Sequence, residues 1–260
     1  MIKANQVHRI RGNQLTKLLW AAGDAILEIY RQNAPGVEIK ADSSPVTQAD
    51  LAANRILMEG LALITPDVPV VSEEDPSSLE IPQSQPVYWL IDPLDGTKEF
   101  IQKNGQFTCN VALIEYGRAT FGLVGVPAQQ LIYIGGPGLG AHRIHLQGSQ
   151  YPIHVAPVGP IIRVIASRSH MNTETSDFIA SLDRPVELVQ AGSSLKFLKI
   201  AEGEADLYPR LGPTCEWDTA AAHAVLEGAG GTVAQLDGTA MCYGKDSVLN
   251  PYFVARGQHG

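Results

Sequence analysis

The chain has 260 residues, of which 45% are hydrophobic and 18% charged, which is ordinary for a soluble globular protein with a large core. A formal net charge of −8 argues against binding to a nucleic acid polymer, but it allows a small phosphorylated ligand whose charge a metal ion balances. The three scattered cysteines form no C-x-x-C pair, and no apolar run is as long as a membrane span. We therefore expect a cytoplasmic protein with no integral membrane segment. Loose association with the inner face of the membrane and the oligomeric state are left open.

The first part of the chain predicts two helices followed by a sheet. Apolar residues recur at helical spacing between Leu15 and Tyr30, and a second helix is expected from about Thr47 to near Pro66. The strands that we expect after it are 68–71, 87–91, 107–115, 119–126, 130–135 and 141–147. Short glycine-bearing turns join the later strands, which is typical of an antiparallel meander.

A segment with three prolines and one glycine, 151–160, is the candidate boundary between two lobes, 1–155 and 156–260. Beyond it, we expect strands at 161–166, 186–190, 205–209, 232–235 and 252–255, and helices at 172–182, 193–201 and 218–227. This alternation predicts a parallel or mixed sheet with helices on its faces. The predicted class is α+β, with an antiparallel sheet in the first lobe.

Two carboxylates lie close together in WLIDPLDGTKEF, residues 89–100. A predicted strand ends at Asp92, and Pro93 and Gly96 indicate a turn that also holds Asp95. Two carboxylates on one turn repel each other unless a cation lies between them, and a hard divalent cation is the natural occupant. Taken alone, however, the two aspartates are better explained as ordinary turn formers.

Two further acidic residues, Glu73 and Asp218, favour the metal site over this explanation. Glu73 follows its predicted strand much as Asp92 does, and Asp50 lies three residues after Thr47, the spacing of a capping box. Asp218 opens a predicted helix, where either it or Thr219 is a candidate N-cap. Each of these residues has an adequate structural explanation. Together with the aspartates of the turn, Glu73 and Asp218 supply oxygen ligands from three separate segments, which suits two or three magnesium ions sharing a substrate phosphate.

The motifs SEED at 72–75, DPLDGT at 92–97 and WDTAAAHAVLEGAGG from residue 217 occur in this order. With them, the chain resembles the inositol monophosphatase superfamily of magnesium-dependent, lithium-sensitive phosphatases. The longer forms DPLDGTKEF, GSSLKF (192–197) and YPRLGPT (208–214) are more similar to the CysQ-type 3′(2′),5′-bisphosphate nucleotidases within it. The resemblance covers nearly the whole chain, and it implies the two-lobed, layered α-β-α-β-α fold of sugar phosphatases.

The resemblance also implies roles for individual residues. The groups expected to hold metal are Glu73, Asp92, the carbonyl of Leu94, Asp95 and Asp218, with Glu74 supporting them. The residues expected to act in catalysis are Asp50, Glu73 and Thr97. Thr97, hydrogen-bonded to Asp50 or Glu73, would orient the attacking water. The residues expected to contact the substrate are Gly96, Thr97, His170, Ser193, Lys196 and Arg210. Ser193, Ser194 and Lys196 lie at the start of a predicted helix, a position suited to an anion.

The implied activity is hydrolysis of the 3′-phosphate of 3′-phosphoadenosine 5′-phosphate, giving AMP and phosphate. Enzymes accelerate phosphate monoester hydrolysis by up to ~10²¹-fold, whereas a general base supplies only about 10²–10⁴. Direct attack by metal-activated water is therefore expected. The alternatives are an inositol or sugar phosphatase of the same superfamily, or a magnesium-dependent nucleotide sensor that does not hydrolyse its ligand. A haloacid-dehalogenase-like phosphatase is disfavoured, because its two aspartates are two residues apart and here the spacing is three.

Overall fold

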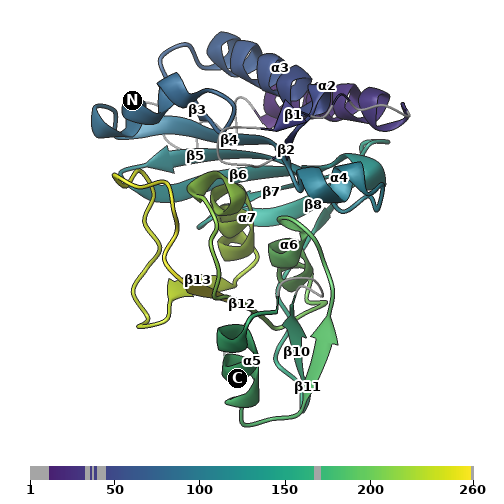
Figure 1. The fold of residues 1–260 in the computed structure, drawn as a ribbon, viewed down its shortest axis with the longest axis vertical. Coiled ribbons are helices and arrows are strands. Elements are labelled where there is room, and N and C mark those ends of the chain that lie inside the picture. Colours follow the sequence, from purple (N-terminus) through teal and green to yellow (C-terminus); the bar gives the residue numbers. More distant parts are fainter. Residues whose placement is uncertain (1–11, 33–35, 37, 40–44, 167–170, 259–260) are drawn as a thin grey trace.

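Two β-sheets alternate with three layers of helices in the order α-β-α-β-α, which confirms the predicted fold class (Figure 1). The structure is a computed structural model, and it describes residues 12–32, 36, 38–39, 45–166 and 171–258. Among these residues, no helix combines the length and the apolar composition needed to cross a bilayer.

The outer layer consists of helices α2 (Gly12–Tyr30) and α3 (Gln48–Ile64), which pack against each other and against the larger sheet. On α2 the buried residues Leu15, Leu19, Ala22 and Ile26 follow helical spacing and form one apolar stripe. This stripe shares a core with side chains from the facing side of the sheet, among them Trp89. Two short strands, β1 (Glu38–Ile39) and β2 (Pro45–Val46), pair just before α3.

The larger sheet has seven strands in the order β3-β4-β5-β6-β7-β8-β9. Their bounds are Val70–Ser72, Val87–Asp95, Thr108–Glu115, Arg118–Val126, Leu131–Gly136, Gly140–His145 and Gln150–Pro152. The strands from β4 to β9 form the predicted antiparallel meander, and a short 3₁₀ turn, Pro127–Gln129, joins β6 to β7. The edge strand β3 instead pairs parallel to β4, since the 3₁₀ helix η2 (Pro76–Gln83) carries the chain back to the starting end of the sheet. The sequence did not predict this parallel pair.

The smaller sheet has five strands in the order β11-β10-β12-β14-β13, and it is mixed, as predicted. Its strands are β10 (Ile162–Ile165), β11 (Val186–Val189), β12 (Leu207–Arg210), β13 (Thr232–Gln235) and β14 (Phe253–Arg256). Helix α5 (Thr173–Ala180) packs on the outer face of this sheet, against Val164, Leu207 and Val254 of strands β10, β12 and β14. Because side chains alternate along a strand, the neighbouring residues Ile165, Tyr208 and Phe253 face the inner layer.

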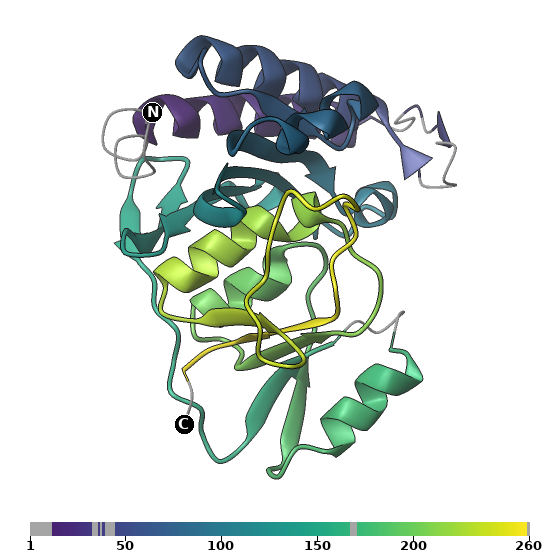
Figure 2. The ribbon, with the colours of Figure 1, turned by 90° about the vertical axis from the view of Figure 1, so that its left-hand side faces the viewer.

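The inner layer, helices α6 (Leu195–Ala201) and α7 (Glu216–Gly228), lies between the two sheets (Figure 2). One continuous core joins the larger sheet, these helices and the smaller sheet. A β-carbon on Gly122 of β6 would lie 2.1 Å from the carbonyl oxygen of Ala221, so α7 packs closely on the sheet there. The predicted lobe boundary falls in the irregular segment between β9 and β10. The division into two lobes stays a prediction, because one continuous hydrophobic core contains residues from both sides of the predicted boundary.

Candidate active site

The parallel pairing of β3 and β4 brings the first two acidic groups together. In this pairing Ser72 lies opposite Ile91, and the Glu73 N–H donates to the Ile91 carbonyl at 3.2 Å. The carboxyl ends of parallel strands meet at the same edge of a sheet. Glu73, the residue after β3, therefore emerges beside Asp92 of β4.

A β-bulge brings Asp92 and Asp95 to the same face. Asp92 pairs with Asn110 of β5 and Asp95 with Thr108, so β4 advances by three residues while its partner advances by two. In a regular strand, residues three apart point to opposite faces of the sheet. The extra residue of the bulge in β4 places the Asp92 and Asp95 side chains on the same face. The prediction that the strand ends at Asp92 was wrong: β4 continues to Asp95, and the chain leaves it at Gly96, where φ is +92°.

The third segment of the site is the first turn of α7. The helix begins at Glu216 with Cys215 as its N-cap, so the prediction of Asp218 as N-cap was wrong. Asp218 is the third helical residue, and its Oδ2 accepts a hydrogen bond from the Cys215 N–H at 2.8 Å. Asn250 Nδ2 donates to the Cys215 carbonyl at 2.7 Å, which ties the C-terminal segment to this turn. The capping interaction fixes the Asp218 carboxylate at the helix start.

Glu73, Asp92 and Asp218 form a three-carboxylate cluster, in which one oxygen from each residue lies within 4.8 Å of the others. Asp92 is only 1% exposed; burial and neighbouring carboxylates, Glu73 first, raise its pKa well above its usual range. Burial and the charge of Asp95 raise the pKa of Asp218 to about 8, against the opposing effects of the Cys215 N–H hydrogen bond and the charge of Arg210. Buried carboxylates at such short distances are costly without a balancing cation. The donor set, all of it hard oxygen, fits a magnesium ion.

Asp95 lies beside this cluster, but one of its carboxylate oxygens already accepts several hydrogen bonds. Its Oδ2 accepts hydrogen bonds from Ser193 Oγ at 2.6 Å, from the Ser194 N–H at 2.8 Å and from Ser194 Oγ at 2.9 Å. Within the described residues, Oδ1 has no hydrogen-bond donor. Asp95 can therefore offer Oδ1 to a metal ion. Ser193, expected to contact the substrate, directs its hydroxyl to this carboxylate.

Thr97 and Asp50 are joined as expected. Thr97 Oγ1 donates to Asp50 Oδ1 at 3.2 Å, and Asp50 Oδ2 accepts from the N–H and hydroxyl of Thr47 at 2.8 and 2.6 Å. Burial raises the pKa of Asp50, against the opposing effect of the Thr47 hydrogen bonds, and the charge of Glu74 raises it further. Asp50 thus caps α3 with one oxygen and binds Thr97 with the other. Thr97 begins the short helix α4 (Thr97–Ile101), which was not predicted.

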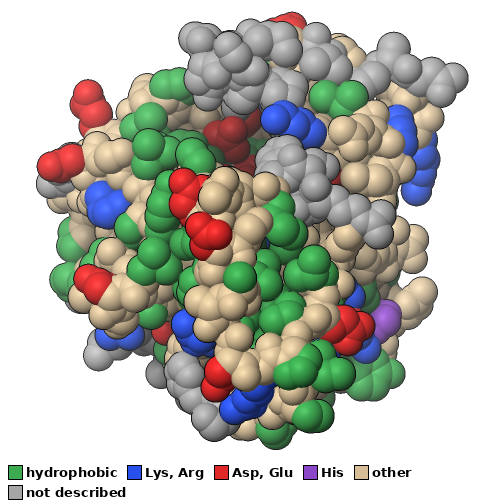
Figure 3. Space-filling model, turned by 60° about the horizontal axis from the view of Figure 1, so that its bottom comes forward, with side chains coloured by type: hydrophobic (Ala, Val, Ile, Leu, Met, Phe, Trp, Pro, Cys, Tyr) green, Lys and Arg blue, Asp and Glu red, His purple; other side chains and the backbone are tan. Residues whose placement is uncertain are grey.

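Two adjoining pockets open from the site. The first, the acidic pocket, has a volume of about 220 Å³, and the second, the outer pocket, about 390 Å³. The acidic pocket is lined by residues that include Asp95, Gly96, Lys98, Thr214 and Asp218. The outer pocket is lined by residues that include Ala166, Met171, Asn172, Pro209 and Leu211. Figure 3 shows a hollow on this side of the molecule with acidic side chains at its floor.

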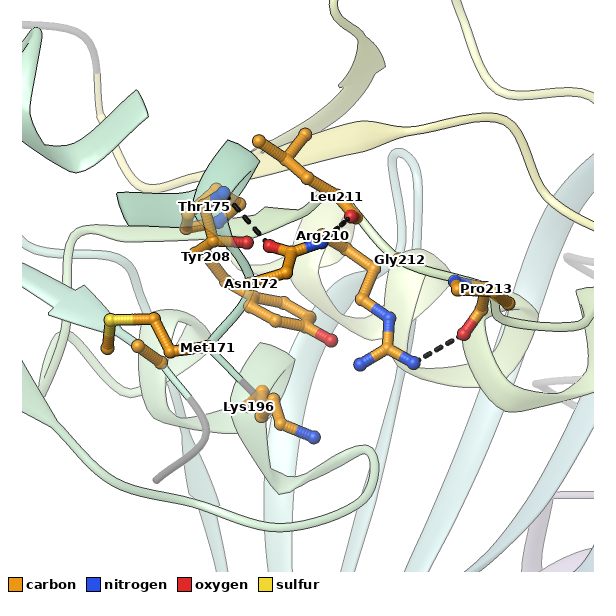
Figure 4. A pocket seen from close by; sticks show the side chains of 11 residues that line it. Met171, Asn172, Thr175, Lys196, Tyr208, Arg210, Leu211, Gly212 and Pro213 are labelled. Carbon is orange, nitrogen blue, oxygen red and sulfur yellow. Dashed lines mark hydrogen bonds between the residues drawn. The ribbon is translucent and has the colours of Figure 1, made fainter. Parts of the chain in front are cut away.

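Lys196, Tyr208 and Arg210 line both pockets and separate them. Figure 4 shows the amino group, hydroxyl and guanidinium of these residues pointing toward one another. The Lys196 amino group lies 5.5 Å from the centre of the Tyr208 ring, and Nη2 of Arg210 donates to the Pro213 carbonyl. Nε of Arg210 is buried without a partner among the described residues. The wall between the pockets therefore carries two positive charges.

Some site residues were missed or are untested. Lys98 and Tyr208 line the acidic pocket but were not predicted, although both lie inside the motifs DPLDGTKEF and YPRLGPT. Glu74 lies outside the three-carboxylate cluster, and its charge acts on Asp50. The predicted substrate residue His170 lies outside the described residues.

Comparison with known proteins connects this site to a family. A model of the inositol monophosphatase family matches residues 12–257. The 3′(2′),5′-bisphosphate nucleotidase CysQ of Escherichia coli (strain K12) is 46% identical over 243 residues, which cover 93% of this chain and 97% of that protein. The protein of the same name from Buchnera aphidicola subsp. Acyrthosiphon pisum (strain APS) is 40% identical, with coverage of 96% and 95%.

Solved structures agree. CysQ from Bacteroides thetaiotaomicron, a bacterial member of the inositol monophosphatase family, superposes with a TM-score of 0.82 at 34% identity, covering 97% of this chain and 99% of that one. The extragenic suppressor protein SuhB from Bartonella henselae shares the fold, with a TM-score of 0.75 at 20% identity and coverage of 95% and 93%. Matches of this extent over the whole layered fold leave one assignment: the chain belongs to the inositol monophosphatase family.

Proposed function

We propose that this protein is a magnesium-dependent 3′(2′),5′-bisphosphate nucleotidase. Its preferred reaction is hydrolysis of the 3′-phosphate of 3′-phosphoadenosine 5′-phosphate to AMP and phosphate. The names of the CysQ relatives at 40–46% identity support this assignment.

The observation that carries the proposal is the pair of adjoining pockets with a cationic wall between them. The acidic pocket takes the phosphate that is cleaved, beside the metal-binding carboxylates. Lys196 and Arg210, in the wall, bind the phosphate that is kept, because cationic side chains hold phosphate through charge-assisted hydrogen bonds. The outer pocket, with Met171 and Leu211 in its lining, takes the nucleoside. An inositol phosphate has no apolar ring system to fill it.

The proposed metal ligands are Glu73, Asp92, Asp218, Oδ1 of Asp95 and the carbonyl of Leu94, for two or three Mg²⁺ ions. When bound, magnesium neutralises the charge of the phosphate and lowers the pKa of water. Without it, the cluster would expose the phosphate to several negative charges.

The remaining steps belong to residues of the chain itself. Because the Thr97 hydroxyl donates its hydrogen bond to Asp50, its lone pairs can accept a hydrogen bond from a water molecule. The pair thereby orients that water toward phosphorus, with Asp50 as the final proton acceptor and Glu73 as an alternative one. Attack forms the new P–O bond and breaks the bond to the ribose 3′-oxygen. That oxygen takes up a proton from solvent, while the proton held by Asp50 is later released to solvent, so the reaction consumes one water molecule. The N–H groups of Gly96 and Thr97 are the proposed donors to the phosphate.

A glycine is required before Thr97. Gly96 has φ of +92°, and a β-carbon on it would lie 3.3 Å from both the Gln106 carbonyl oxygen and Cβ of Ser193. A side chain here would be strained and would crowd Ser193 and the Gln106 carbonyl.

The test is release of phosphate with Mg²⁺ from three substrates at equal concentration: 3′-phosphoadenosine 5′-phosphate, inositol 1-phosphate and fructose 1,6-bisphosphate. We expect the highest kcat/KM for the nucleotide. A preference for either of the other two would replace the proposal with the inositol or sugar phosphatase. Nucleotide binding with no phosphate release from any of them would make the protein a sensor.

We further propose that the protein acts in the cytoplasm. In the part of the chain that the structure describes, no disulfide involves Cys109, Cys215 or Cys242, which suits a reducing compartment. Fractionation of cells that express the tagged chain tests this, and recovery mainly with membranes would contradict it.

A further inference from the structure

Ser194 joins three elements of the active site through one buried hydroxyl. It lies just before α6 and is 1% exposed. Its Oγ lies 2.9 Å from Oδ2 of Asp95 on β4 and 2.9 Å from the carbonyl oxygen of Asp218 on α7. It also accepts a hydrogen bond from Asn110 Nδ2 on β5 at 2.9 Å.

A serine hydroxyl has one proton, and a charged carboxylate is a stronger acceptor than a carbonyl. The stronger assignment therefore has Ser194 donating to Asp95 through both its hydroxyl and its N–H, the latter at 2.8 Å. The other assignment, donation to the Asp218 carbonyl, still ties the residue to a segment that carries an acidic ligand. In both cases Ser194 connects the bulge of β4 to the first turn of α7.

The preceding residue supports the same arrangement. Ser193 has a left-handed backbone with φ of +51°, which is uncommon for a residue with a side chain. In this conformation Ser193 Oγ and the Ser194 N–H both reach Asp95 Oδ2. The anion at the start of α6 is therefore the carboxylate of Asp95, where the sequence had suggested a substrate phosphate.

We propose that Ser194 is a positioning residue of the metal site. By holding Oδ2 it orients the carboxylate of Asp95 so that Oδ1 stays available, and it keeps the β4 bulge in register with the helix turn that carries Asp218. This inference rests on the metal site of the proposed function. It does not depend on which phosphate ester is the substrate.

The test is calorimetric titration of metal-free protein with Mg²⁺, with thermal unfolding as a second readout. We expect Ser194→Ala to lower Mg²⁺ affinity by about 10-fold to 100-fold, the usual effect of removing a group that orients a metal ligand. The matched control is Thr65→Val. Thr65 is also fully buried, accepts from Trp89 Nε1 at 2.8 Å and donates to the Leu61 carbonyl at 3.0 Å, away from the site. The Thr65→Val variant should lose thermal stability but keep the Mg²⁺ affinity of the wild type.

An unchanged Mg²⁺ affinity in Ser194→Ala, or an equal loss in both variants, would overturn the inference. If Ser194→Ala does not unfold cooperatively, Ser194→Thr and Ser194→Cys replace it. Threonine keeps the hydroxyl donor, whereas cysteine keeps a similar shape with only a weak donor. The Mg²⁺ affinity must therefore be higher for Ser194→Thr than for Ser194→Cys. Equal affinities or the reverse order would contradict the inference. Wild-type protein that fails to bind Mg²⁺ would instead refute the proposed function itself.

Discussion

The close approach of α7 to the larger sheet leads to a prediction that links the fold to metal binding. A β-carbon on Gly122 would lie 2.1 Å from the Ala221 carbonyl oxygen, whereas ordinary contact begins at 3.4 Å. Gly122→Ala must therefore move the helix by about 1.3 Å, since the obstacle is backbone. Overpacking of this kind costs about 1–3 kcal/mol, which lowers Tm by about 2–4 °C per kcal/mol in a chain of this size.

The same displacement should reach the active site. Asp218 lies three residues before Ala221 on the helix, while Glu73 and Asp92 are held by the sheet. A misplacement of about 1 Å at a reactive centre can cost about 100-fold in rate. We therefore expect Gly122→Ala to lose Mg²⁺ affinity and activity together, beyond its loss of stability.

The assay compares Tm, Mg²⁺ affinity by calorimetry and kcat in Gly122→Ala and Gly159→Ala. Gly159 lies in the irregular segment between the sheets and has no atom within 4 Å of an added β-carbon, so the control should behave as wild type. A lower Tm for Gly122→Ala with wild-type Mg²⁺ affinity would refute the reasoning, because the helix would then move without disturbing the site.

Three further predictions concern the site itself. Asp95→Asn should lower kcat by about 100-fold or more and leave Tm nearly unchanged, because it removes charge but keeps an acceptor for the serine donors; loss of cooperative unfolding would make Asp95 structural. Asp218→Asn should raise the Tm of metal-free protein, because it replaces a carboxyl that burial and the charge of Asp95 destabilise in its ionised form. It should also abolish the Mg²⁺-dependent rise in Tm, which in wild type corresponds to about 2.7 kcal/mol at 100 times Kd, and a full Mg²⁺ response in this variant would contradict the cluster. Lys98→Gln should raise KM for the bisphosphorylated nucleotide about tenfold with little change in kcat, the effect of one charge-assisted hydrogen bond, and an unchanged KM would remove Lys98 from the substrate site.

Most helices and strands could be predicted because local pattern decides them, whereas the layered arrangement was implied by the family resemblance. Helical spacing from Leu15 and the alternating apolar strands are visible along the chain, and the capping box of Thr47 and Asp50 formed as expected. The edge strand β3 was predicted but its parallel pairing with β4 was missed, since η2 contains Pro76 and Pro82 and reads as a polar loop. Pairing of strands distant in sequence depends on how such a connection turns in space.

The acidic residues of the site could be identified from the sequence, but their arrangement in space could not. The spacing of Asp92 and Asp95 gave no sign of the bulge that places them on one face, because a bulge is defined by the partner strand. Cys215 is not a preferred N-cap residue, so the start of α7 was placed too late. The contacts of Ser194 with Asn110 and Asp95 join segments 84 and 99 residues apart in sequence, which no local pattern can show.

The most direct measurement of the central claim is anomalous diffraction from crystals soaked in manganese, a heavier substitute for magnesium. The convergence of Glu73, Asp92 and Asp218 predicts one or more anomalous peaks within coordination distance of these carboxylates. Well-diffracting, fully soaked crystals with no peak between the three side chains would contradict the account.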